Sequence, residues 1–149
     1  MTVLSIEQGS NCVVGQFRAM ASPCEVLLEP QDKALCHRLT ELAATEAERI
    51  EQKYSRYRPD SVLSRINDNA GSWQTLDSET VQLLAFAQQC YQLSDGLFDI
   101  SSGILRRVWQ FDGSDNIASQ SEIEQLLPFI GWHKVKLDAQ QLFLPTGME

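Results

Sequence analysis

The sequence predicts an α+β fold built from two strand pairs with two main helices. Short segments rich in Val, Leu and Phe occur near both ends of the chain, and such segments are typical of strands. Two long stretches between them repeat apolar residues at three- and four-residue spacing, which is typical of amphipathic helices. The chain has 149 residues, a length that suits one domain.

The first strand pair is expected over residues 13–20 and 25–28, which are rich in Val, Leu and Phe. The Ala-Ser-Pro sequence at residues 21–23 separates them and predicts a tight turn, so a hairpin is expected. Residues 1–12 are interpreted as an N-terminal tail, and residues 13–149 as the domain.

The longest predicted helix covers residues 33–54. Its acidic residues lie mostly off the apolar stripe, as expected for a solvated face. A shorter helix is expected over residues 61–66, after Pro59 and with Asp60 or Ser61 as its N-cap. The apolar stripe of the long helix consists of Leu35, Leu39, Leu42, Ala43, Ala47, Ile50 and Tyr54.

The second main helix is predicted to begin after an N-cap at Asp77 or Ser78 and to end near Leu93. A short extended piece at residues 73–75 precedes it, and a helical turn at residues 103–108 follows it. These elements connect the two predicted strand pairs.

A polar, turn-rich segment at residues 111–118 follows. Ser121 and Glu124 then fit a capping box, which predicts a helix that extends to Leu127. This helix is short because a proline comes directly after Leu127.

The second strand pair is predicted at residues 133–137 and 141–144, around a turn at residues 138–140. In a partial domain, the last strand is expected to leave an unpaired edge at residues 142–144. Open strand edges favour pairing with another chain, so this edge predicts concentration-dependent self-association.

Composition and charge exclude several classes of protein. Twenty Asp and Glu residues against twelve Lys and Arg residues disfavour nonspecific nucleic-acid binding. No segment is long and apolar enough to cross a bilayer. The N-terminus shows no signal peptide, and Cys12 lacks the residues that precede a lipidated cysteine. If Met1 is the natural start, a cytoplasmic location is expected.

The four cysteines form no Cys-x-x-Cys pair, and the two histidines lie far apart in the sequence. A zinc site is therefore not expected. Buried reduced thiols are the favoured interpretation.

Two runs of residues contain the candidate functional positions. Residues 94–103 (SDGLFDISSG) combine Gly, Asp and Ser around an apolar centre, and residues 54–67 (YSRYRPDSVLSRIN) alternate aromatic, cationic and hydroxyl side chains. The first run fits a loop that holds a ligand, or alternatively a helix C-cap followed by an apolar turn. Together and in this order, the two runs resemble the FAD:protein FMN transferase (ApbE) family.

The resemblance covers the chain from about Phe17 to Glu149. The family's Ser-x-Gly-x-Phe-Asp pattern with a later Trp is matched from Ser94 to Trp109, and residues 130–138 resemble the segment before its central strand. Many members of the family are exported lipoproteins, a pattern from which this chain departs.

The resemblance implies five flavin-contacting residues, and each has a structural alternative. Met20 precedes Ala where the family usually has Gly, and is otherwise a core methionine. Tyr57 is implied to stack on a flavin or adenine ring, and is otherwise a boundary tyrosine. Leu97, Phe98 and Asp99 are implied to face the nucleotide, although Asp99 also fits a helix cap over the residues that follow.

The resemblance also implies a reaction: magnesium-dependent transfer of FMN from FAD to a Thr or Ser of a target flavoprotein, with release of AMP. The family's Asp-x-Gly-Gly-x-x-x-Lys-Gly segment and Asp-x-x-x-Thr metal loop are absent from these 149 residues. We therefore expect an FAD-binding N-terminal portion, inactive alone, with no catalytic or metal-ligating residue assigned. The alternative is a non-catalytic binding or protein-interaction module.

Overall fold

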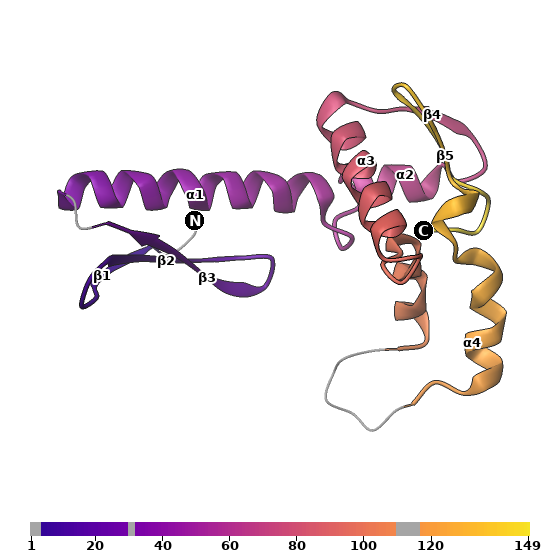
Figure 1. The fold of residues 1–149 in the computed structure, drawn as a ribbon, viewed down its shortest axis with the longest axis horizontal. Coiled ribbons are helices and arrows are strands. Elements are labelled where there is room, and N and C mark those ends of the chain that lie inside the picture. The colour runs from indigo at the N-terminus through magenta and orange to yellow at the C-terminus, as the bar shows by residue number, and fades with distance from the viewer. Residues whose placement is uncertain (1–3, 30–31, 110–116) are drawn as a thin grey trace. The chain divides into compact units, whose positions relative to one another are not determined.

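The computed structural model describes residues 4–29, 32–109 and 117–149, which contain α-helices, 3-10 helices and small antiparallel sheets (Figure 1). The mixture of helices and sheets confirms the predicted α+β class. The chain divides into two compact units, Met1–Arg65 and Ile66–Glu149. Each unit has its own sheet, so each is described separately.

The first unit contains an antiparallel sheet in the order β1-β2-β3. The hairpin of β2 and β3 is confirmed, but its turn falls on Met20 and Ala21, because Ser22 already pairs with Ala19. β1 was not predicted; it lies within the segment interpreted as a tail and pairs with β2. The strands are Ser5–Gln8 (β1), Val13–Ala19 (β2) and Ser22–Leu28 (β3).

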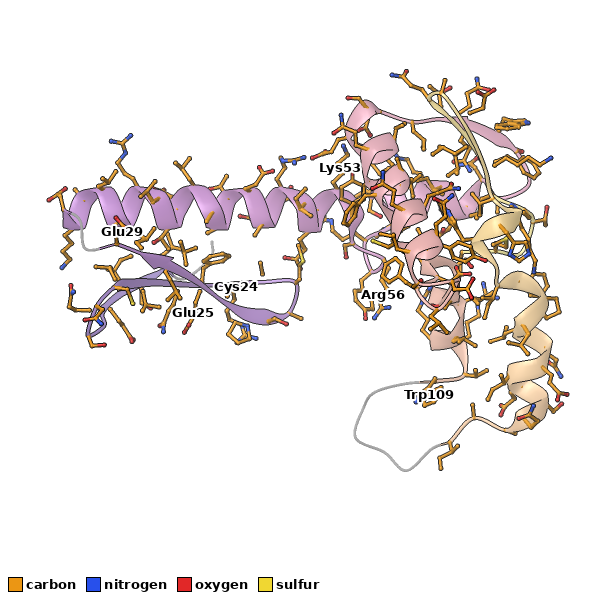
Figure 2. All side chains as sticks on the ribbon, in the orientation of Figure 1. Cys24, Glu25, Glu29, Lys53, Arg56 and Trp109 are labelled. Carbon is orange, nitrogen blue, oxygen red and sulfur yellow. The ribbon has the colours of Figure 1, made fainter. Side chains whose placement is uncertain are left out.

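Side chains alternate along β3 between the core and solvent. Cys24 is partly buried against the core, whereas the next residue, Glu25, is exposed (Figure 2). The core of this unit centres on Phe17, Ala19 and Ala44. One face of the sheet therefore packs against a helix and the other faces solvent.

Helix α1 (Lys33–Tyr54) matches its predicted bounds and packs on β2. Its buried residues are Cys36, Thr40 and Ala44. Ala43 and Ala47 of the predicted stripe pack against the core of the unit, so the stripe is confirmed there and is wrong for its leucines. The cause is a close approach to Gly15: a Cβ at that position would lie 2.0 Å from Thr40 Oγ1. Only small side chains fit there. The three leucines of the predicted stripe are instead 37–64% exposed: Leu35, Leu39 and Leu42.

Two helices follow in the sequence at or near the boundary between the units. Helix α2 (Val62–Asp68) crosses the boundary and confirms the predicted short helix, displaced by one or two residues. Helix α3 (Ser78–Leu93) matches its prediction, and Asp77 is the N-cap, accepting hydrogen bonds from Glu79 N and Thr80 N.

The sheet of the second unit has the order β4-β6-β5. β4 was predicted as a short extended piece, but it pairs with β6 and makes that strand central. Leu142 and Phe143 are paired with a strand on each side, so the predicted open edge at residues 142–144 is wrong. The edges are β4 and β5. The strands are Trp73–Thr75 (β4), Lys136–Asp138 (β5) and Gln141–Phe143 (β6).

The remaining helices show two further differences from the sequence predictions. The capping box is formed by Ser119 and Glu122, two residues before the predicted pair, Ser121 and Glu124. The strand predicted from residue 133 begins later, because a 3-10 turn follows Gly131 (φ 134°). Most of the segment at 111–118 lies outside the described residues. The helices are η1 (Ile100–Arg107), α4 (Gln120–Leu126), η2 (Leu127–Phe129) and η3 (Trp132–Lys134).

Candidate functional site

Met20 lies at the tip of the β2–β3 hairpin in the first unit. Met20 and Ala21 both have left-handed backbone conformations, with φ values of 52° and 59°. The amide of Met20 donates a hydrogen bond to Glu51 Oε2 at 2.9 Å, from helix α1. The Met20 side chain is 53% exposed, so it is not a core methionine.

Tyr57 lies in the turn after α1 and is 79% exposed. Arg56 Nη2 donates to Tyr57 Oη at 2.7 Å, and the Arg56 Cζ lies 4.9 Å from the ring centroid. The ring therefore presents most of its surface to solvent while its hydroxyl is held by a neighbouring cation. Neither contact places Tyr57 in the core.

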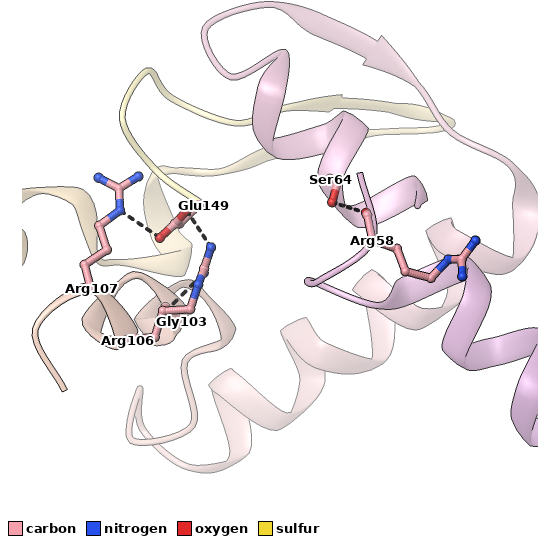
Figure 3. A network of polar contacts seen from close by, with 6 residues as sticks. All are labelled: Arg58, Ser64, Gly103, Arg106, Arg107 and Glu149. Atoms are coloured by element: carbon pink, nitrogen blue, oxygen red, sulfur yellow. Dashed lines mark hydrogen bonds and ion pairs between the residues drawn. The ribbon is translucent and has the colours of Figure 1, made fainter. Parts of the chain in front are cut away.

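The turn around Tyr57 is fastened by polar contacts close in sequence. Ser64 Oγ donates to the Arg58 carbonyl at 2.6 Å (Figure 3), and Ser64 N donates to Ser61 Oγ at 2.9 Å. Through these bonds, Ser61 and Ser64 hold the backbone that follows Tyr57. The Arg58 guanidinium donates to Asp60 and lowers the pKa of that carboxyl.

Leu97 and Phe98 lie on the loop after α3, in the second unit. Leu97 is 92% exposed and Phe98 is 47% exposed. The backbone beneath them is fixed, because Phe98 N donates to Ser94 Oγ at 2.8 Å and Gly96 (φ 81°) donates to the Tyr91 carbonyl at 2.9 Å. The loop thus shows the alternative prediction, a helix C-cap followed by an apolar turn, and the apolar side chains of that turn are exposed.

Asp99 caps the 3-10 helix η1, as its structural alternative predicted. Its Oδ1 accepts from Ser101 N at 2.9 Å and from Ser101 Oγ at 2.6 Å, while its Oδ2 accepts from Trp132 N at 2.9 Å. Ser101 Oγ in turn accepts from Gly131 N at 2.8 Å. Both carboxylate oxygens are therefore used to join η1 to the turn at residues 131–132.

Ser101 and Glu51 are positions that the sequence analysis missed. A local signal pointed to Ser101, because the Asp-x-Ser spacing of Asp99 and Ser101 is typical of a cap. Glu51 had no such signal, because its partner Met20 lies 31 residues away in the sequence.

A third polar cluster joins helix η1 to Glu149 within the second unit. Arg106 Nη2 and Arg107 Nε donate to the two carboxylate oxygens of Glu149 at 2.9 and 3.1 Å (Figure 3). The Glu149 side chain is only 10% exposed. These two ion pairs hold the largely shielded Glu149 carboxylate against η1, while both arginine side chains are partly exposed to solvent.

Two features are not found within the described residues: a group of metal-binding side chains and a membrane-spanning helix. No group of three or more His, Cys, Asp or Glu side chains converges there in a way that could hold a metal ion. Over the same ranges, no helix combines the length and apolar character needed to cross a membrane.

Known structures share this fold. The apbe protein from Thermotoga maritima matches with a TM-score of 0.79 and 24% identity, over all of this chain and 46% of that one. Flavinyl transferase ApbE from Pseudomonas stutzeri, in its apo form, matches with a TM-score of 0.66 and 21% identity, over all of this chain and 46% of that one.

A variant of flavin transferase ApbE from Vibrio cholerae has a TM-score of 0.63 and 19% identity, over 97% of this chain and 45% of that one. The chain therefore spans less than half the length of these proteins. None of the curated proteins compared with it matches. The model of the ApbE family matches residues 20–149. This chain belongs to the ApbE family.

Proposed function

We propose that this chain is the FAD-binding N-terminal portion of an FAD:protein FMN transferase. In the reaction, a Thr or Ser hydroxyl of a target flavoprotein attacks the FMN-side phosphorus of FAD. The phosphoanhydride bond breaks, AMP leaves, the hydroxyl loses its proton, and FMN remains attached through a phosphoester. FAD is the substrate and the target flavoprotein is the partner.

The observation that supports this proposal is the exposure of the family-matched side chains. Met20, Tyr57, Leu97 and Phe98 are all at least 47% exposed, although each is apolar or aromatic. All four lie on turns or loops whose backbones are held by hydrogen bonds. Apolar groups displayed on fixed loops are typical of binding sites, whereas core residues are buried.

The role proposed for this chain is to bind and orient FAD. Exposed aromatic and thioether groups offer faces for a flavin or adenine ring. The family's reaction is magnesium-dependent, and the family's Asp-x-Gly-Gly-x-x-x-Lys-Gly segment and Asp-x-x-x-Thr metal loop are not found in these 149 residues. We therefore assign no metal ligand here and expect no FMN transfer by the isolated chain.

Titration of FAD with the chain tests the binding role, with flavin fluorescence anisotropy as the readout. Saturable binding that weakens in Met20→Ala and Leu97→Ala variants supports the proposal. Leu27→Ala is the matched control, since Leu27 is a 69% exposed leucine outside the proposed site. An equal effect of all three substitutions, or no saturable binding, contradicts it. In-gel flavin fluorescence after incubation with FAD, magnesium and a target flavoprotein tests the expected inactivity.

The alternative function is a non-catalytic protein-interaction module. The observation that favours it is the exposed leucine face of α1, formed by Leu35, Leu39 and Leu42. A single mass by sedimentation velocity across a wide concentration range argues against self-association through this face. A Leu42→Glu variant that abolishes a measured dimer supports it.

A further inference from the structure

The β2–β3 turn has an unfavourable backbone conformation for its residues. Met20 and Ala21 have φ values of 52° and 59°, in the left-handed region that Gly and Asn occupy most readily. Two-residue hairpin turns of this kind usually contain Asn-Gly or a similar pair. A turn of Met and Ala therefore depends on contacts from its surroundings.

Glu51 supplies such a contact within the first unit. Its Oε2 accepts the Met20 amide hydrogen at 2.9 Å. The flanking pair Ala19–Ser22 is the last pair of the ladder, so this amide lies beyond the strand pairing. Because the carboxylate belongs to the long helix α1, it ties the tip of the hairpin to a rigid element.

We infer that Glu51 is a positioning residue for FAD binding, acting through the backbone of Met20. The hydrogen bond holds the turn in the conformation that presents the half-exposed Met20 side chain. This inference rests on the proposed function, because Met20 is assigned there as a flavin contact. Glu51 itself contacts the turn and is not assigned a contact with FAD.

Three variants test the inference by FAD titration. We expect Glu51→Ala to weaken FAD binding by about tenfold, since the turn loses its charged acceptor. Glu51→Gln retains an oxygen acceptor, so it is expected to recover most of the affinity. Adding Ala21→Gly to Glu51→Ala is also expected to recover affinity, because Gly adopts a positive φ without steric cost.

Two controls separate positioning from general stability. Glu41→Ala removes an exposed carboxylate from the same helix and is expected to leave FAD affinity unchanged. Hydrogen exchange at the Met20 amide is expected to accelerate in Glu51→Ala and to stay unchanged in Glu41→Ala. Thermal unfolding of each variant shows whether any loss of binding follows a loss of folding.

The possible failures are distinct. Wild type that binds no FAD contradicts the proposed function, and the inference falls with it. Wild type that binds FAD as tightly as Glu51→Ala overturns the inference alone. The inference is also overturned if hydrogen exchange at the Met20 amide is unchanged in Glu51→Ala. It is likewise overturned if Glu51→Ala loses FAD affinity and the added Ala21→Gly does not recover it. In either case Glu51 is a merely structural residue.

Discussion

The Met20–Ala21 turn and the Leu97–Asp99 loop both display apolar side chains, yet their backbones are held differently. In the turn, two residues without glycine's freedom adopt positive φ. The amide of the first donates a hydrogen bond to Glu51, and the carbonyl of the second accepts one from Arg18. In the loop, Asp95 and Gly96 also take positive φ, and the Asp99 carboxylate accepts three hydrogen bonds. Several hydrogen bonds therefore hold the loop, whereas Glu51 is the distant residue that holds the turn.

Among the variants, the largest effect on stability is expected from removing the Asp99 side chain in the loop. Asp99→Ala leaves the Trp132 and Ser101 amides without their acceptor, and Trp132 is only 6% exposed. We expect the free energy of unfolding to fall by about 2–4 kcal/mol. Urea unfolding measures the change. Asp99→Asn keeps only one acceptor oxygen and turns its NH2 group toward the other set of donors, so it is expected to recover only part of the lost stability. Full stability in Asp99→Asn or Asp99→Ala contradicts this explanation.

Tyr57→Ala is expected to reduce FAD affinity by about 1–3 kcal/mol, a tenfold to hundredfold effect, while stability changes little. The reason is that the ring is 79% exposed and contributes little to the core. Tyr57→Phe keeps the ring but loses the hydrogen bond from Arg56, and it is expected to retain most of the affinity. FAD titration and thermal unfolding check both variants. Unchanged affinity with strong destabilisation rules out the site assignment.

Ser101→Ala tests how much one buried hydroxyl contributes to the stability of the loop. The substitution removes the acceptor for Gly131 N and the donor to Asp99, at a residue that is 4% exposed. A loss of about 1–2 kcal/mol in the free energy of unfolding is expected. Ser102→Ala is the matched control, because its hydroxyl donates to the Asp99 carbonyl from an exposed position. Similar losses in both variants argue against a special role for the buried hydroxyl.

The smallest expected effect is in the Met20–Ala21 turn. Ala21→Gly relieves the unfavourable φ of 59° but also makes the unfolded chain more flexible, so a net gain of about 0.5 kcal/mol is expected. Gly96→Ala is the opposite change in the loop, where φ is 81°, and a loss of about 1 kcal/mol is expected. Thermal unfolding measures the change in stability of both variants. A gain in Ala21→Gly with a loss in Gly96→Ala is expected, and changes of the same sign contradict the explanation.

Local signals made the helix predictions succeed. The bounds of α1 and α3 follow from apolar periodicity and from caps such as Asp77, whose hydrogen bonds reach two or three residues along the chain. Residues 94–103 were also singled out from their composition, and the structure has a loop up to Asp99 followed by helix η1 from Ile100. These features depend on neighbours in the sequence, so the sequence is sufficient to predict them.

The prediction for residues 142–144 failed for the opposite reason. β6 is central because β4, far earlier in the sequence, pairs with it, and the three-residue length of β4 gave no indication of its partner. β1 was likewise missed, since its pairing with β2 turns a short polar segment into a strand. Strand order depends on contacts between distant residues, which composition and periodicity do not encode.

The sequence by itself determined the α+β class, the length of the long helices, their caps and the family resemblance. Only the tertiary structure decided which face of α1 is buried, because the close approach of Gly15 to Thr40 excludes the leucines from that contact. It also decided that Glu51 holds Met20 and that Asp99 holds Trp132. These partners lie more than 30 residues apart in the sequence, and the hydrogen bonds between them form only when folding brings the segments together.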